Sequence, residues 1–156
     1  MSQRGGLRFE IPVESDCAPL NSLVADMLAY SNQIHCLRDP TRGGLASTLN
    51  ELAMQSGVGI NIEEGKIPVH QSVSAACELL GFDPLYVANE GKLVAVVSSA
   101  CAEGALNAMK RNRYGGESAI IGEVVSEHPG RVIMKTLLGA SRIIDMLSGE
   151  LLPRIC

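Results

Sequence analysis

A length of 156 residues suffices for one domain with a core of its own, and a hydrophobic content of 46% excludes a disordered chain. Aromatic residues make up only 3% and Trp is absent, so we expect an aliphatic core. The net charge of −4 argues against nucleic-acid binding, which depends on basic patches, and the short basic cluster at residues 110–113 is interpreted as a solvated helix end.

Five cysteines are present, an odd number, and no two of them are spaced like the ligands of a zinc site. This usage predicts reduced thiols, no metal site and a cytoplasmic location. We expect no membrane association, since the first residues carry no apolar signal segment and no stretch has the length of a membrane span. Cys77 and Cys101 lie in amphipathic patterns and are expected to be small apolar side chains of the core.

The elements predicted in the first half of the chain are three helices and a strand. Apolar spacing predicts helices from about residue 20, over 45–55 and over 70–80, and a strand over 58–62. Residues 1–8 are linker-like, and Asn21 or Ser22 is expected to cap the first helix. Gly57 and Gly81 follow the second and third helices and are expected to end them.

Helices and strands interleave in the second half. The predicted elements are an extended segment at 85–88, strands at 93–97, 120–125 and 131–135, a helix at 101–111 and a short helix at about 141–147. The turn at residues 128–130 predicts that the two strands around it form an antiparallel hairpin. We therefore predict the α+β class, with a mixed sheet of four or more strands, a single domain over residues 1–150 and a separate tail at 151–156.

Residues 38–44, with the sequence RDPTRGG, lead directly into the predicted helix at 45–55. A glycine-rich entry to a helix exposes backbone N–H groups, and the helix dipole favours an anion there. Arg38 and Arg42 would add bidentate contacts to a phosphate. The alternative is a helix start in which Asp39 pairs with the arginines.

Residues 83–92, with the sequence DPLYVANEGK, place a polar turn between two apolar runs. Gly91 permits a tight turn with positive φ. Glu90 would then stand at a strand edge, where a carboxylate can act as a general base. The alternative is an exposed turn glutamate without a function.

The last six residues, 151–156, form a short tail, LLPRIC, which ends in Cys156. A terminal cysteine can reach away from the body of the domain, and Pro153 stiffens the segment before it. The thiol is a nucleophile only as the thiolate; its own carboxylate opposes ionisation and Arg154 favours it. The alternative is a terminal cysteine without a function.

Together the three segments resemble the HypE family of hydrogenase expression/formation proteins. The resemblance runs from about residue 9 to residue 156 and rests on RDPTRGGLASTLNELA at 38–53, DPLYVANEGK at 83–92 and PRIC at 153–156. HypE belongs to the superfamily of aminoimidazole ribonucleotide synthetase and selenophosphate synthetase. The first segment alone is typical of this superfamily, whereas the terminal cysteine distinguishes HypE from its other members.

The resemblance implies an ATP-dependent carbamoyl dehydratase that makes the cyanide ligands of [NiFe]-hydrogenase. Cys156 would receive a carbamoyl group from the carbamoyltransferase HypF, and ATP would convert that group into a thiocyanate for the HypC–HypD complex. Glu90 matches the family's acid that deprotonates the nitrogen. The residues that match the loop facing the nucleotide are Thr41, Arg42, Gly43 and Gly44.

The resemblance also implies a three-layer α/β/α sandwich, the C-terminal domain of the aminoimidazole ribonucleotide synthetase type. Family members carry an N-terminal domain that supplies most of the site for ATP and magnesium and the main homodimer contact. We therefore expect the isolated chain to be inactive. The competing interpretation is a non-catalytic interaction module that docks its tail into a partner.

Overall fold

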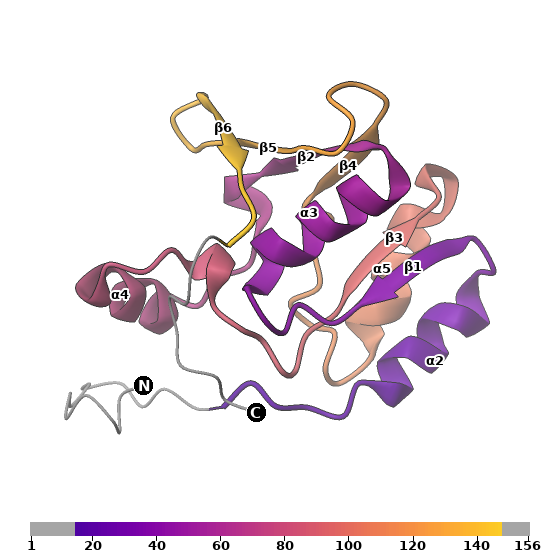
Figure 1. Ribbon diagram of the computed structural model, residues 1–156. Helices are drawn as coiled ribbons and strands as arrows, with labels where there is room; N and C mark the ends of the chain where they lie inside the picture. Colours follow the sequence, from indigo (N-terminus) through magenta and orange to yellow (C-terminus); the bar gives the residue numbers. More distant parts are fainter. Residues whose placement is uncertain (1–14, 148–156) are drawn as a thin grey trace.

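The computed structural model describes residues 15–147, which follow one another as alternating helices and strands (Figure 1). Residues 1–14 and 148–156 lie outside the described range. The helices are α2 (Asn21–Tyr30), α3 (Gly44–Ser56), α4 (Gln71–Leu80) and α5 (Ala102–Arg111), with short 3-10 turns at Glu64–Lys66 (η1), Pro84–Tyr86 (η2) and Ser99–Cys101 (η3). The strands are β1 (Ile34–Arg38), β2 (Gly59–Glu63), β3 (Val94–Val97), β4 (Gly122–Val125), β5 (Val132–Lys135) and β6 (Ser141–Ile144).

The strands form two sheets. β1 and β3 pair antiparallel in a two-stranded sheet, with a register irregularity between Ile34 and Cys36. The four-stranded sheet has the order β4-β2-β5-β6, in which β2 runs parallel to β5 and the other neighbours are antiparallel. The predicted α+β class with a mixed sheet of four strands is therefore confirmed.

Helix α3 packs on both sheets and forms the centre of the core. The period-2 alternation of β2 and β5 directs their apolar residues to one face, toward the apolar stripe of α3. The buried core residues of these elements and of β6 are Ala46, Leu49, Leu52, Ala53, Ile60, Ile62, Val132, Met134 and Ile144. The core is aliphatic, as the composition predicts.

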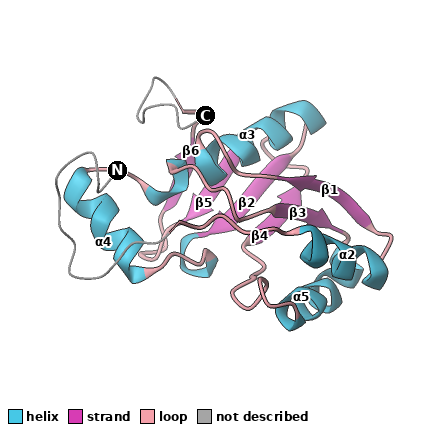
Figure 2. Ribbon diagram, turned by 90° about the horizontal axis from the view of Figure 1, so that it is seen from below, coloured by secondary structure: helices cyan, strands magenta, loops and turns pink. Residues whose placement is uncertain are grey.

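The sheet of β1 and β3 lies between helices on both of its sides, which is the predicted α/β/α layering (Figure 2). Cys36, Val94 and Val96 pack toward the core beneath α3. On the other side α2 and α5 pack against each other and cover the sheet (Figure 2). Within residues 15–147 the helices are too short and polar to cross a membrane.

The helix ends agree with the sequence-based predictions where a glycine terminates the helix. Gly57 and Gly81 adopt the left-handed conformation after α3 and α4, as predicted, because glycine meets no Cβ clash there. The predicted cap of α2 is wrong: Leu20 occupies the N-cap position and no side chain caps the helix. The carbonyl of Leu20 nevertheless accepts the first helical hydrogen bond, from the amide of Val24 at 3.0 Å.

The predicted hairpin of residues 120–125 and 131–135 is wrong. The two strands exist, as β4 and β5, but β2 lies between them and pairs with both. The connection passes the start of β2, where the amide of Gly130 donates to the carbonyl of Val58 at 2.8 Å. The apolar residues of β2 are buried best at the centre of the sheet. The burial gained by placing β2 between β4 and β5 outweighs direct pairing of β4 with β5.

Two further predicted elements differ from the structure. The expected helix at 141–147 is strand β6, which pairs with β5 through a tight turn where Gly139 has a φ of 83°. The expected extended segment at 85–88 begins inside a 3-10 turn, because Pro84 starts the turn and the Asp83 carboxylate accepts from the amide of Leu85 at 2.9 Å.

Candidate functional site

The start of α3 is built from two glycines with left-handed backbone. Gly43 and Gly44 have φ values of 74° and 63°. A Cβ on Gly44 would lie 2.5 Å from the carbonyl oxygens of both Leu85 and Val87. Only glycine therefore lets the start of α3 approach the 84–86 turn this closely.

Hydrogen bonds from Asn89 add to the contact of Gly44 with residues 85–87 and join the two segments that the sequence singles out. The amide of Asn89 donates to the carbonyl of Pro40 at 3.0 Å, and the Asn89 side chain donates to the carbonyl of Val87 at 2.9 Å. Residues 38–44 and 83–92 are thus adjacent in space, although about forty positions separate them in the chain. They form one candidate site.

The charged groups of residues 38–44 have different surroundings. The Arg38 guanidinium pairs with Glu51 at 2.5 Å, so the alternative in which it pairs with Asp39 does not hold. Thr41 and Arg42 are exposed, and within residues 15–147 no protein group binds the Arg42 side chain. Arg42 is therefore the arginine of this loop that is available to an external anion.

A shallow pocket of about 450 Å³ opens beside this loop, between the start of α2 and the end of β1. Its lining residues are Leu20, Asn21, Val24, Leu37, Arg38, Asp39, Thr41 and Leu93. In the described part of the chain no three His, Cys, Asp or Glu side chains come together as they would around a metal ion.

Glu90 lies on an exposed turn, and within residues 15–147 its carboxylate has no hydrogen-bonding partner. The turn itself is held by Asp16, whose carboxylate accepts from the Glu90 amide at 3.1 Å and from Lys92 Nζ at 2.9 Å. Burial raises the pKa of Asp16, but Lys92 and the amides of Glu90 and Gly91 outweigh it and lower that pKa overall. Asp16 is therefore a fixed anion beneath the turn.

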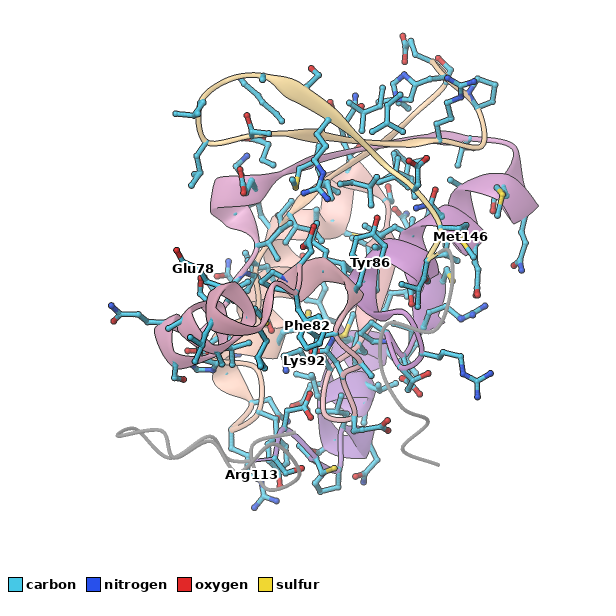
Figure 3. The ribbon with its side chains drawn as sticks, turned by 60° about the vertical axis from the view of Figure 1, so that its left-hand side comes forward. Glu78, Phe82, Tyr86, Lys92, Arg113 and Met146 are labelled. Carbon is cyan, nitrogen blue, oxygen red and sulfur yellow. The ribbon has the colours of Figure 1, made fainter. Side chains whose placement is uncertain are left out.

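The end of β6 is fastened to the same region. Arg142 pairs with Asp83 at 2.6 Å, and the Tyr86 hydroxyl donates to the carbonyl of Asp145 at 3.0 Å. Figure 3 shows Tyr86 beside the segment that leads to Met146. Burial raises the pKa of the Tyr86 phenol, so it remains a hydrogen-bond donor at neutral pH.

The last described residue, Leu147, also reaches the candidate site. A Cβ on Gly43 would lie 3.6 Å from the Cβ of Leu147. The chain thus leaves the described domain next to the glycines of residues 38–44. Cys156 lies outside the described residues.

The remaining thiols are less suited to chemistry. Cys77 is buried, as predicted, and burial together with the nearby Asp83 raises the pKa of its thiol. Cys101 is half-buried and its sulfur lies 3.3 Å from the carbonyl of Ser98. The position of Cys77 agrees with the predicted role as a small core residue, whereas the half-buried Cys101 lies outside the core and that prediction is wrong.

Asp16, Tyr86 and Arg142 contribute to the site but were not singled out from the sequence. Asp16 contacts Lys92 across 76 positions, and Arg142 contacts Asp83 across 59 positions. Neither pair has a local pattern in the sequence. Tyr86 lies within the DPLYVANEGK segment, and its hydroxyl is the only feature of this residue that indicates a polar role.

Sequence comparison identifies the domain. A model of the family described as "AIR synthase related protein, C-terminal domain" matches residues 1–135. The chain belongs to this family. The family assignment agrees with the mixed sheet and the glycine-rich start of α3.

Within the family the chain is similar to HypE proteins. It is 57% identical over its whole length to the carbamoyl dehydratase HypE of Azotobacter vinelandii, of which it covers 46%. A crystal structure of the hydrogenase maturation protein HypE in complex with ATP matches 99% of the chain at 46% identity and a TM-score of 0.93. The chain covers 48% of that structure.

A crystal structure of a HypE–HypF complex matches 94% of the chain at 48% identity and a TM-score of 0.88, and the chain covers 47% of the matched protein. The chain therefore spans about half the length of the HypE proteins that it matches. The similarity extends over all three of the segments that the sequence singles out.

Proposed function

We propose that the chain is the carrier part of an ATP-dependent carbamoyl dehydratase that makes the cyanide ligands of [NiFe]-hydrogenase. The observation that carries this proposal is that residues 38–44, residues 83–92 and the end of β6 meet at Gly43 and Gly44. They meet in a chain that is 57% identical, along its whole length, to a protein named carbamoyl dehydratase HypE.

In the proposed reaction, the Cys156 thiolate first attacks the carbonyl carbon of a carbamoyl donor and forms an S–C bond. The bond from that carbon to the donor's oxygen breaks, the donor oxygen leaves with the electron pair, and the product is a thiocarbamate. The carbamoyl oxygen then attacks the γ-phosphorus of ATP and ADP leaves. Loss of the nitrogen protons and cleavage of the C–O bond release phosphate and leave a protein thiocyanate. The oxygen departs with the phosphate, so no oxidant or reductant is needed.

Glu90 is the proposed base for the nitrogen proton. Its carboxylate is exposed and has no hydrogen-bonding partner within residues 15–147, so it is free to accept a proton. Its turn is joined to residues 38–44 by the hydrogen bond from Asn89 to Pro40. This arrangement supports a base that stands next to the groups that would face the nucleotide.

Thr41 and Arg42 are the proposed contacts to ATP, since both are exposed at the start of α3 and Arg42 has no protein partner in the described range. Gly43 and Gly44 shape the loop rather than bind, because both are buried. Asp39 is the only carboxylate of residues 38–44, which does not fit a complete magnesium site. Any magnesium would need ligands from outside this chain, and we assign it no step.

The tail is long enough for the proposed role. Nine residues follow Leu147, and an extended chain of that length spans at most about 30 Å. A tail of this length can therefore bring Cys156 back to the site beside Gly43 or carry it up to about 30 Å from Leu147 toward a partner. HypF is the proposed carbamoyl donor and HypC–HypD the proposed acceptor, with a homodimeric full-length protein in the cytoplasm.

Mass spectrometry of the full-length protein tests the proposal. After incubation with HypF, carbamoyl phosphate and ATP, the C-terminal peptide is expected to carry a carbamoyl group on its reactive thiolate, which makes it about 43 Da heavier than the unmodified peptide. Conversion to the thiocyanate should then leave it about 25 Da heavier than the unmodified peptide. Cys17→Ala, which removes another exposed thiol, should react like the wild type, and Cys156→Ala should not react. An unmodified Cys156 would instead favour the non-catalytic docking module.

A further inference from the structure

Residues 16–18 pack directly against the turn that carries Glu90. Asp16 Oδ2 accepts two hydrogen bonds from this turn, from the Glu90 amide at 3.1 Å and from Lys92 Nζ at 2.9 Å. A Cβ on Gly91 would lie 1.5 Å from the carbonyl oxygen of Asp16. The segment before α2 and the turn therefore fit together only with glycine at position 91.

The other side of the turn is fixed by a different set of contacts. The Asn89 amide donates to the carbonyl of Pro40, and the Asn89 side chain donates to the carbonyl of Val87. The backbone on both sides of Glu90 is thus held, while the carboxylate is left exposed. A general base must be held in place in this way, because small displacements of a reacting group slow the reaction strongly.

We propose that Asp16 is a positioning residue for Glu90, which holds the turn at residues 89–92 so that the Glu90 carboxylate faces the reacting group. This inference rests on the proposed function of Glu90. The lowered pKa of Asp16 keeps its carboxylate charged at neutral pH, and Lys92 offsets that charge. Asp16 therefore anchors the turn without placing an unpaired negative charge beside Glu90.

The inference predicts an effect on one step of the reaction. Asp16→Ala removes both hydrogen bonds and should slow dehydration about 10- to 100-fold, as expected for a base misplaced by a fraction of an ångström. Transfer of the carbamoyl group to Cys156 should proceed at the wild-type rate. Asp16→Asn keeps an acceptor for the Glu90 amide and should recover most of the dehydration rate.

The experiment is a single-turnover assay on full-length enzyme already carbamoylated at Cys156, mixed with ATP and quenched for mass spectrometry. Glu63→Gln is the matched control, since it removes another exposed carboxylate–lysine pair, with Lys66 at 2.6 Å, in a different part of the chain. Its rate should equal that of the wild type. Asp16→Ala should cause no further slowing in a Glu90→Gln background, because the two residues act through one group.

Several outcomes separate this inference from the proposed function. If Glu90→Gln slows dehydration and Asp16→Ala does not, the positioning role is wrong and the function of Glu90 stands. Equal slowing by Asp16→Ala with and without Glu90 would also overturn the positioning role. If Glu90→Gln has no effect, the proposed function of Glu90 fails, and the inference fails with it.

Amide hydrogen exchange on the 156-residue chain provides a test that does not depend on activity. The Glu90 amide should exchange faster in Asp16→Ala and at nearly the wild-type rate in Asp16→Asn, while core amides of α3 stay unchanged. Unchanged exchange at Glu90 in Asp16→Ala would overturn the inference. Loss of protection throughout the chain would show a general structural role and would overturn it as well.

Discussion

Residues 38–44 and residues 89–92 border the same site, but different forces hold them. The first segment is fixed by close backbone packing, since Gly44 lies against the carbonyls of Leu85 and Val87 and is itself buried. The second is also packed closely, at Gly91 against the carbonyl of Asp16, but it depends in addition on the ion pair between the half-buried Asp16 and the exposed Lys92. Packing of the first kind is insensitive to pH and salt, whereas exposed ion pairs are weak and screened. The start of α3 is therefore held by packing, whereas the turn at residues 89–92 depends in part on an ion pair that pH and salt can weaken.

The largest effect is expected for Gly44→Ala. The substitution forces a Cβ to within 2.5 Å of two carbonyl oxygens at a φ of 63°, so it should lower the free energy of unfolding by more than about 2 kcal/mol. Gly57→Ala is the matched control, because Gly57 has a φ of 64° and no atom within 4 Å of a Cβ. It should cost only about 1–2 kcal/mol, which is the conformational cost of an alanine in the left-handed region. If urea unfolding shows that Gly44→Ala and Gly57→Ala lose the same free energy of unfolding, the close packing of Gly44 does not contribute to stability.

A smaller, pH-dependent effect is expected for Asp16→Asn. The exposed pair with Lys92 should contribute about 0.2–1 kcal/mol to the free energy of unfolding. Folding lowers the pKa of Asp16 from its ordinary value of 3.8, so this stability is present above that value and is lost as the pH falls through the folded pKa. The difference between wild type and variant should be constant above about pH 5 and shrink below about pH 4.

Urea unfolding of both proteins at several pH values measures this difference, and Glu63→Gln provides a comparison at a second exposed pair. A difference that grows as the pH falls would contradict the lowered pKa. A difference in the free energy of unfolding that persists at high salt would contradict a contribution from the Asp16–Lys92 ion pair.

Local features of the fold could be predicted from the sequence, and long-range pairings could not. The ends of α3 and α4 could be predicted because each helix is followed by a glycine, and the left-handed backbone conformation at Gly57 and Gly81 is a local property of those residues. The hairpin was wrong because the partner of β4 and β5 is β2, and the choice of partner depends on burial across the whole sheet. The alternation within each strand is the same for either pairing.

The candidate site divides in the same way. The motifs at residues 38–44 and 83–92 are recognisable in the sequence, and the structure brings them together through Asn89 and Pro40. Asp16 was not predicted, because an acidic residue before a helix has many ordinary roles and its partner Lys92 is 76 positions away. The assignments of Glu90 and Cys156 remain predictions.

In the proposed function, Glu90 is the base and lies beside the site at which the last described residue, Leu147, leaves the domain. A single-turnover assay of Glu90→Gln in the full-length enzyme tests this most directly, with the thiocarbamate on Cys156 formed beforehand. We predict that the thiocarbamate persists and that thiocyanate forms about 10²- to 10⁴-fold more slowly, since that is the usual loss on removing a general base. Carbamoylation of Cys156 should be unchanged. Formation of thiocyanate at the wild-type rate would contradict the account.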